Sequence, residues 1–320
     1  MNFFRSVRAV TSATGDGPID WQAVAEATKA ATDPGDLTLA DTEQAGYADD
    51  VRDARNRVQE VSGIDFDVPR TVEIQHRHHW VDANITTFER VMAPLEDQQL
   101  SMIPGVARVV NTGTMAFALS FLANNVLGQY DPLLLAEESK EQIDHGLYFV
   151  HPNIVRVADM LDAPFPRFRR WIAFHEVAHA AEFGAAPWLS DHLEAQMREG
   201  IDDLSDGNIN REAFTELNTA MTAVEGYAEL IMDHAFDDEY EDLRRKLDER
   251  RKGGGPIAQL VRRMLGMGMK RRQYELGKEF FEMVAAVRDI ETAALVWEQP
   301  ENLPTKDELA NPARWIARVA

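Results

Sequence analysis

The chain has 320 residues, of which 45% are apolar and 27% charged, a composition typical of a folded globular protein and not of a disordered one. It contains no cysteine. Disulfides, thiolate zinc sites and cysteine nucleophiles are therefore excluded, and any metal must be held by His, Asp or Glu.

The net charge is −21 and lysine is scarce, as expected of a protein in concentrated salt, which screens self-repulsion. We expect a halophilic, cytoplasmic protein that binds neither nucleic acid nor membrane; an ordinary acidic soluble protein is the alternative.

Hydrophobic segments long enough for export or membrane insertion are not expected. The N-terminus has no continuous apolar stretch of signal-peptide length. The uncharged run 109–130 is interrupted by Asn, Thr, Ser, Gln and Gly, whereas a spanning helix needs about 20 predominantly apolar residues. The run therefore predicts a buried core helix.

The N-terminal half reads mainly as helix. Asp20 is a plausible N-cap for a helix to about residue 32, which Asp33-Pro-Gly ends. A second helix is predicted over Asp41–Ser62, stopped by Gly63. Alternation over Thr71–Gln75 predicts a short strand, and helical patterns return around 79–92 and 106–127.

The C-terminal half begins with two short apolar runs, 133–136 and 147–150, which are candidate strands of a small sheet. Helices are predicted after Pro166 to residue 183, closed by Gly184, then from about Pro187, and over about 211–236. The Gly-rich segment 252–256 reads as a flexible loop.

Two further helix starts are predicted near the C-terminus. Thr305 and Glu308 form a capping box, and Asn311 is a cap before Pro312. The fold class is thus mainly α with a small β-sheet. We expect a single domain over 1–320, with a helical N-terminal part (about 1–130) and a motif-bearing C-terminal part (about 131–320).

The segment His175-Glu-Val-Ala-His179 matches H-E-x-x-H. Residues four apart lie on one helix face, so His175 and His179 can share one metal ion. Glu176 can reach a zinc-activated water and take its proton while the metal polarises a carbonyl. The alternative is two core histidines beside a surface glutamate on an ordinary amphipathic helix.

A catalytic zinc ion needs a third protein ligand. The extended motif with a third histidine fails, because Glu182 and Ala185 stand at its glycine and histidine positions. Glu225 is the best candidate, since it is the only charged residue between Leu217 and Ala228 and flanks an apolar seam.

Two other carboxylates lie close to these residues in sequence. Glu229, one turn after Glu225, is placed to accept a hydrogen bond from a ligating histidine, although a solvated helix-face carboxylate is almost as good a reading. Glu182 lies on the motif helix itself, where it either supports a ligand in the same way or faces the surface.

Together these pieces resemble the type 2 zincin-like metallopeptidases, one branch of which is associated with biosynthesis of the deazaflavin coenzyme. The resemblance covers most of the chain and rests on these segments: His79-Trp-Val-Asp-Ala-Asn84, His175-Glu-Val-Ala-His179, Glu225-Gly-Tyr-Ala-Glu-Leu-Ile-Met-Asp233, Lys270-Arg-Arg-Gln-Tyr-Glu-Leu-Gly277 with Phe280, Leu303-Pro-Thr, and Asn311-Pro-Ala-Arg-Trp-Ile-Ala-Arg318. It implies a mostly helical, gluzincin-type zincin fold, zinc as the cofactor with His175 and His179 as ligands, Glu176 as the base, and Glu225 as the third ligand.

Three other signals have weaker readings. Neighbouring His78 and His79 diverge in either helix or strand, so with His76 they fit a cleft lining or solvated positions better than a metal site. Tyr227 and His234 are candidates to stabilise an oxyanion, or ordinary helix-face residues. The basic segment 241–272 is able to bind nucleic acid or to pair with the acidic remainder; we favour pairing, because it lacks interleaved aromatic residues.

The expected function is that of a zinc-dependent hydrolase, in particular a metallopeptidase acting on a peptide or another amide. The alternative is a non-catalytic, metal-binding zincin-fold protein that serves as a binding or assembly component, for instance in coenzyme biosynthesis. The oligomeric state is not predicted.

Overall fold

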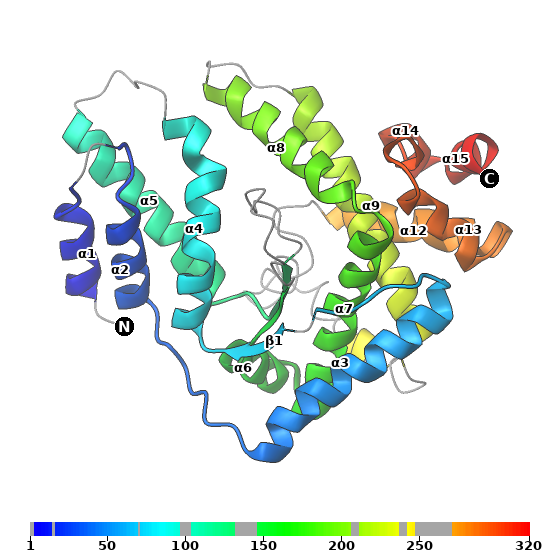
Figure 1. The fold of residues 1–320 in the computed structure, drawn as a ribbon, viewed down its shortest axis with the longest axis horizontal. Coiled ribbons are helices and arrows are strands. Elements are labelled where there is room, and N and C mark those ends of the chain that lie inside the picture. Colours follow the sequence, from blue (N-terminus) through cyan, green and yellow to red (C-terminus); the bar gives the residue numbers. More distant parts are fainter. Residues whose placement is uncertain are drawn as a thin grey trace.

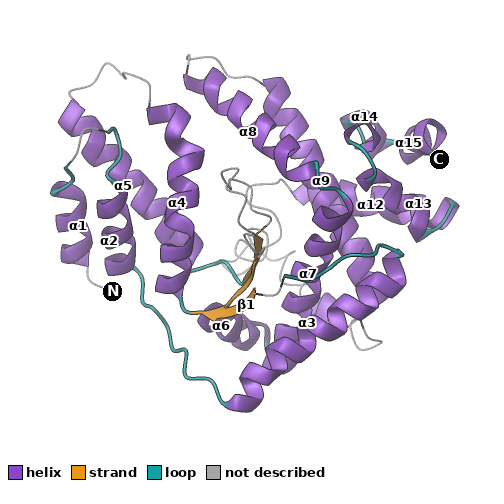
Figure 2. Cartoon of the chain, in the orientation of Figure 1, coloured by secondary structure: helices purple, strands orange, loops and turns teal. Residues whose placement is uncertain are grey.

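The computed structural model describes residues 3–14, 17–69, 71–96, 104–131, 146–205, 211–236, 242–246 and 271–320. This part of the chain consists mainly of helices arranged around a small sheet (Figure 2), with the two chain ends on opposite sides (Figure 1). The elements are, in chain order, α1 (Phe3–Thr11), α2 (Trp21–Ala31), α3 (Asp41–Ser62), β1 (Thr71–Gln75), α4 (Arg77–Glu96), α5 (Pro104–Ala123), β2 (Gly128–Asp131), β3 (Gly146–Val150), α6 (His151–Leu161), α7 (Phe165–Ala185), α8 (Leu189–Ser205), α9 (Arg211–Ala235), α12 (Arg271–Val287), α13 (Ile290–Ala294), α14 (Lys306–Ala310) and α15 (Pro312–Val319), with two 3₁₀ turns at Leu295–Trp297 and Pro300–Asn302.

The sheet has the strand order β1-β3-β2 within the described residues. β1 is parallel to the central β3, with Thr71 opposite Gly146, and β2 is antiparallel to it, with Gly128 opposite Phe149. Leu147 and Phe149 of β3 are fully buried. The strands predicted at Thr71–Gln75 and 147–150 are confirmed. β2 was not predicted, and the candidate strand 133–136 lies outside the described residues.

The best-defined helix predictions are confirmed. Asp20 caps α2, its carboxylate accepting from the Ala23 N–H at 2.9 Å. α3 spans Asp41–Ser62 and ends at Gly63, whose φ of 69° is the left-handed conformation that only glycine adopts without strain. Thr305 and Glu308 form the capping box of α14. The mainly α fold with a small sheet is therefore confirmed.

Two predicted helix boundaries differ in detail. Gly184 does not end α7, which continues to Ala185. A Cβ on Gly184 would lie 3.1 Å from the Phe66 Cβ, so this glycine allows close packing instead of stopping the helix. Asn311 stands at the N-cap of α15, but its side chain makes no capping hydrogen bond.

α7 lies at the centre of the molecule. It packs against α3, α6, α9 and β2, and most of its residues are buried. The main apolar core extends from these elements to α12, α14 and α15. The environment of the α7 side chains is therefore set by several surrounding elements at once, which also explains why this helix is apolar on almost every face.

A second apolar cluster joins α2, α4 and α5 and reaches the sheet through Val150. α5 carries most of the uncharged run 109–130. It buries Ala116, Leu119 and Ala123 in this cluster, while Phe117 is 76% exposed, so the core-helix prediction holds for one face only. No described helix has the length and hydropathy needed to cross a bilayer. The division into a single domain with two parts stays a prediction.

Candidate metal centre

Two histidines of α7 point to one place. His175 and His179 lie one turn apart, and their Nε2 atoms are 3.3 Å from each other. The His175 ring stacks on the Trp171 ring, with centroids 5.8 Å apart and planes 10° apart, while His179 meets His175 edge-on. The helical spacing and the flanking aromatic ring therefore present two imidazole nitrogens to a common point.

A carboxylate from a second helix completes a triad. Ligand atoms of His175, His179 and Glu225 all lie within 4.8 Å of one another, and this is the one group of possible metal ligands among the described residues. Glu225 is on α9, 50 positions after His175 in the chain. The convergence predicted from the sequence is thus present.

The crossing of α9 and α12 sets the position of Glu225. A Cβ on Gly226 would meet the Gly277 backbone, with the Gly277 oxygen at 2.6 Å, and a Cβ on Gly277 would meet the Thr222 oxygen. The two backbones therefore touch at the residue that follows Glu225. This close approach is the structural reason for a glycine in the middle of α9, where it costs about 1 kcal/mol relative to alanine.

His179 has a carboxylate partner on its other side. Its Nδ1 lies 2.9 Å from Oε2 of Glu182, a fully buried residue. Donation from Nδ1 leaves the Nε2 lone pair free to face the triad, as in the carboxylate–histidine pairs of metal sites. Of the two readings open for Glu182, a surface position is therefore wrong, and support of a ligand stays a prediction that this contact favours.

The carboxylates around the triad are removed from solvent. Glu182, Glu225 and Glu229 are all buried, and Lys278 lies 3.8 Å from Glu229. Oε2 of Glu225 has no hydrogen-bond partner among the described residues. Burial raises the pKa of Glu225 to about 8, and the neighbouring carboxylates act in the same direction. A divalent cation would stabilise the charged form of the buried Glu225 carboxylate, so the donor set fits a metal ion.

Glu176 lies against the sheet. Its Oε2 accepts a hydrogen bond from the Tyr130 N–H of β2 at 2.9 Å. A Cβ on Gly128 would lie 2.5 Å from its Oε1, so the strand approaches the carboxylate closely because residue 128 has no side chain. Burial raises the pKa of Glu176 to about 7, although His179 and the Tyr130 N–H lower it. Neither β2 contact was predicted from the sequence.

The family follows from these features together with sequence comparison. A family model described as zincin-like metallopeptidase matches residues 19–209 and 203–316. The chain belongs to this family. Membership confirms the expected zincin fold and indicates a zinc hydrolase. It does not address deazaflavin biosynthesis, so that association stays a prediction.

One solved structure resembles this chain over almost its whole length. It is a crystal structure of a "putative hydrolase with a novel fold" from Chloroflexus aurantiacus, with a TM-score of 0.71 and 27% sequence identity, covering 99% of this chain and 98% of the other. No curated protein matches the chain.

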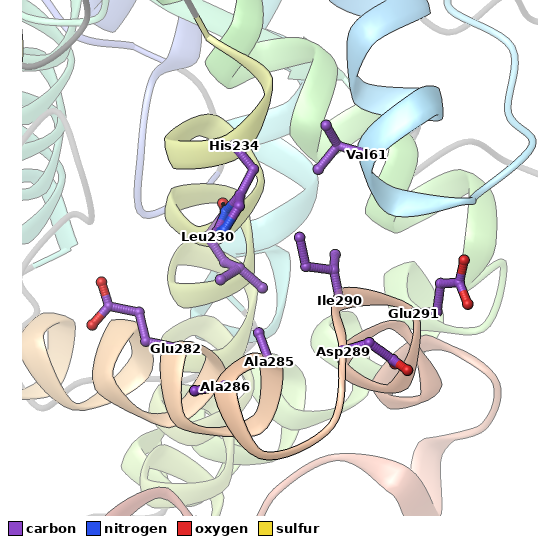
Figure 3. A pocket seen from close by; sticks show the side chains of 9 residues that line it. All are labelled: Val61, Leu230, His234, Glu282, Ala285, Ala286, Asp289, Ile290 and Glu291. Atoms are coloured by element: carbon purple, nitrogen blue, oxygen red, sulfur yellow. Dashed lines mark hydrogen bonds between the residues drawn. The ribbon is translucent and has the colours of Figure 1, made fainter. Parts of the chain in front are cut away.

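Other residues singled out in the sequence lie away from the triad or have different contacts. Glu229 is 1% exposed, which rules out the solvated reading; its role toward a histidine stays a prediction. Tyr227 is buried with its ring against Phe281 and Trp297. His234 lines a cavity of about 570 Å³ between α3, α9, α12 and α13 (Figure 3). Because His234 follows Glu225 by nine positions on one helix, the two occupy opposite sides of α9.

The remaining signals are structural in the described part of the chain. The His76 and His79 rings stack with centroids 3.7 Å apart, and Nε2 of His78 lies 2.9 Å from the Thr32 oxygen. Most of the basic segment 241–272 lies outside the described residues. Within its described part, Arg244 pairs with Asp233 at 2.6 Å, in line with the pairing interpretation; the absence of nucleic-acid binding stays a prediction.

Proposed function

We propose that the chain is a zinc-dependent peptidase in which His175, His179 and Glu225 hold the metal and Glu176 is the general base. The observation that carries the proposal is the meeting of three ligand atoms from α7 and α9 within 4.8 Å of one another. The Glu225 oxygen without a hydrogen-bond partner among the described residues supports it. The alternative, two core histidines beside a surface glutamate on an ordinary helix, gives no reason for the Glu225 carboxylate to be buried next to them.

Zinc bound at this triad supplies Lewis acidity toward a substrate carbonyl. The proton transfers fall to Glu176, whose pKa of about 7, raised by burial, suits a group that both accepts and donates a proton near neutrality. Glu176 takes a proton from the attacking water and delivers it to the leaving amine. The Tyr130 N–H holds one carboxylate oxygen, which orients the other for this transfer.

A peptide is the substrate class that the architecture favours. β2 is an edge strand of the described sheet, and Glu176 contacts this strand. An extended peptide is able to add to a sheet edge through main-chain hydrogen bonds. A peptide bound in this way would place one of its carbonyl groups beside Glu176. A compact amide has no extended main chain and would form no such row of hydrogen bonds with the strand.

Metal analysis tests the ligand assignment. The purified protein should contain about one zinc per chain, and Glu225→Ala should lower that occupancy, because it removes one of three ligands. Glu216→Ala, on the exposed N-terminal part of the same helix, is the matched control and should keep full occupancy. Unchanged zinc content in Glu225→Ala would show that the third ligand is a different group.

The base assignment is tested by Glu176→Gln. This variant should retain zinc but lose turnover of a fluorogenic peptide library, since an amide cannot accept the proton. In cells lacking the protein, full rescue by Glu176→Gln would instead favour the non-catalytic role as a binding or assembly component.

A further inference from the structure

A side-chain clamp joins α4 to β2. The Trp80 indole N–H donates to Oε1 of Gln129 at 2.7 Å, and Nε2 of Gln129 donates to Oδ1 of Asn84 at 2.9 Å. The Asn84 amide is itself fixed, because its Nδ2 donates to the Trp80 carbonyl oxygen at 2.8 Å. Trp80 and Asn84 are 3% and 6% exposed, so the partners of Gln129 are held in place by the α2–α4–α5 cluster.

The peptide group next to this clamp is the one that contacts Glu176. The N–H that donates to Oε2 of Glu176 belongs to Tyr130 and lies in the planar peptide unit between Gln129 and Tyr130. A rotation or translation of Gln129 therefore moves the donor of Glu176 directly. The hydrogen bonds from the Gln129 side chain to Trp80 and Asn84 tie this peptide unit to α4. On the other side of the peptide unit, the Tyr130 ring lies against the Phe183 ring of α7, with centroids 5.6 Å apart.

Within the described sheet, β2 is a short strand with one strand partner. β2 is four residues long and pairs only with β3 in the described sheet. Short edge strands open locally at low free energy, because few backbone hydrogen bonds must break. Two hydrogen bonds to a half-buried glutamine add restraint at the position where the strand meets the base.

We propose that Gln129 is a positioning residue, which through Trp80 and Asn84 holds the Gln129–Tyr130 peptide group so that its N–H orients the Glu176 carboxylate. This inference rests on the proposed function of Glu176. It gives a role to the His79–Asn84 segment, which contributes no ligand to the triad. The Gln129 side chain is not one of the three candidate ligands; it acts on the base through Tyr130 and Glu176.

The test compares Gln129→Leu and Trp80→Phe with matched controls. Gln75→Leu removes a side-chain hydrogen bond to Glu73 in β1, on the other edge of the same sheet. Trp315→Phe removes an indole hydrogen bond elsewhere in the chain, from a buried tryptophan to the Asn302 oxygen. For each variant we measure the zinc content, hydrogen exchange at the Tyr130 amide, and kcat and KM on a fluorogenic peptide library. A crystal structure of each zinc-loaded variant is also determined.

We expect Gln129→Leu to accelerate exchange at the Tyr130 amide at least about tenfold, as loss of two partly buried hydrogen bonds implies. Zinc content should stay unchanged. kcat should fall about 10–100-fold because the base loses its orientation, and KM should rise by a smaller factor because the substrate-binding edge of β2 is loosened but still present. Trp80→Phe should do the same to a smaller extent, the double variant should be no worse than Gln129→Leu alone, and both controls should resemble wild type.

Wild-type exchange at Tyr130 in Gln129→Leu would overturn the proposal. Faster exchange with the Tyr130 N–Glu176 Oε2 contact intact in the crystal structure, or with undiminished kcat, would also overturn it, because the clamp would then hold the strand without orienting the base. If wild-type protein cleaves no peptide, the proposed function fails, and exchange and crystal structures still decide whether the clamp positions Glu176.

Discussion

Glu182 shows how much of the site depends on a single side-chain direction. It lies three residues after His179 on α7, where it is able to turn back toward that residue, and it is fully buried with its Oε2 2.9 Å from His179 Nδ1. Burial raises the pKa of Glu182 well above its ordinary value. A carboxylate that accepts from Nδ1 makes the imidazole a better ligand and fixes its orientation.

Removal of this carboxylate should therefore weaken metal binding. We predict that Glu182→Ala lowers zinc affinity about 10–100-fold, the usual effect of losing such a partner. Glu182→Gln, which keeps an acceptor oxygen, should lose less. Competition with a chelator measures the affinity, and Glu194→Gln, which breaks an ion pair with Arg198 on α8, is the control. Equal zinc affinity in Glu182→Ala and wild type would contradict this role.

At the scale of single residues, the sequence predicted that His175, His179 and Glu225 meet, but it did not predict which groups contact them and Glu176. The spacing of His175 and His179 and the isolation of Glu225 in an apolar stretch were sufficient to expect one site, because both follow from local pattern. The choice between two roles for Glu182 required the position of α9. The Tyr130 N–H had no sequence signal, since a backbone donor is present at every residue except proline.

Among the elements, the crossing of α9 and α12 has the strictest geometry. Gly226 and Gly277 meet backbone to backbone, directly beside Glu225. Lys278, the next residue of α12, lies 2.9 Å from Asp233 and 3.8 Å from Glu229. The helix that supplies the carboxylate is thus held by a contact that admits no side chain and by an ion-pair network on its flank.

Gly226→Ala should consequently separate the two helices. The methyl group gains about 1 kcal/mol of helix propensity but collides with the Gly277 backbone, and overpacking of this kind costs about 1–3 kcal/mol or more. We predict a net loss of about 1–2 kcal/mol, seen as a lower Tm, together with weaker zinc binding. Gly113→Ala is the control: its Cβ would meet only the Val10 side chain at 3.3 Å. A Tm equal to wild type in Gly226→Ala would disprove the tight crossing.

α14 and α15 are joined through one carboxylate. Arg318 donates to Oε1 and Oε2 of Glu308 at 2.7 and 2.9 Å, and Glu308 also accepts from the Thr305 N–H. Hydrogen bonding from Arg318, with further bonds from Thr305, holds the pKa of Glu308 below its ordinary value. A carboxyl whose pKa is lower in the folded state adds stability that is complete above the unfolded-state pKa and lost as pH falls through the folded-state pKa.

Glu308→Gln should therefore destabilise the protein in a pH-dependent way. We predict a loss of about 1 kcal/mol at pH 7, which shrinks below about pH 4.5 as the wild-type carboxyl becomes protonated. Thermal melts of both proteins between pH 7 and pH 3 measure the difference. Glu301→Gln, where Arg318 contacts the backbone oxygen and not the side chain, is the control. A difference that grows on acidification would have the wrong sign.

The elements themselves were predictable where the signal is local. α3 begins and ends at the predicted residues because Glu43 caps its first turn and Gly63 takes a left-handed φ at its end. β2 was missed because Gly128–Asp131 has no alternating pattern and becomes a strand only by pairing with β3. α6 was missed because it follows β3 directly, with Val150 at its N-cap and no side-chain cap.

For the whole molecule, charge is the property the sequence defines best. The chain has 54 acidic and 33 basic residues. Some of the described ion pairs are solvent-exposed, such as Arg52–Asp49, and exposed pairs contribute only about 0–1 kcal/mol each. Added salt weakens these attractions but also screens the repulsion from the net excess of 21 negative charges. The repulsion is the larger effect, so the sign of the salt dependence follows from the charge excess.

The halophilic interpretation, which the fold leaves open, can be tested on this basis. We predict that Tm rises by several degrees between about 0.02 and 0.5 M KCl, a range over which the Debye length falls from roughly 20 to 4 Å, and that most of the rise is complete by its upper end. Differential scanning calorimetry measures it. Sorbitol at matching osmolality is the control, because an uncharged solute does not screen charge. A Tm that is constant or falls with KCl would mean that the acidic surface carries no repulsive cost, and the protein would then be acidic without being adapted to salt.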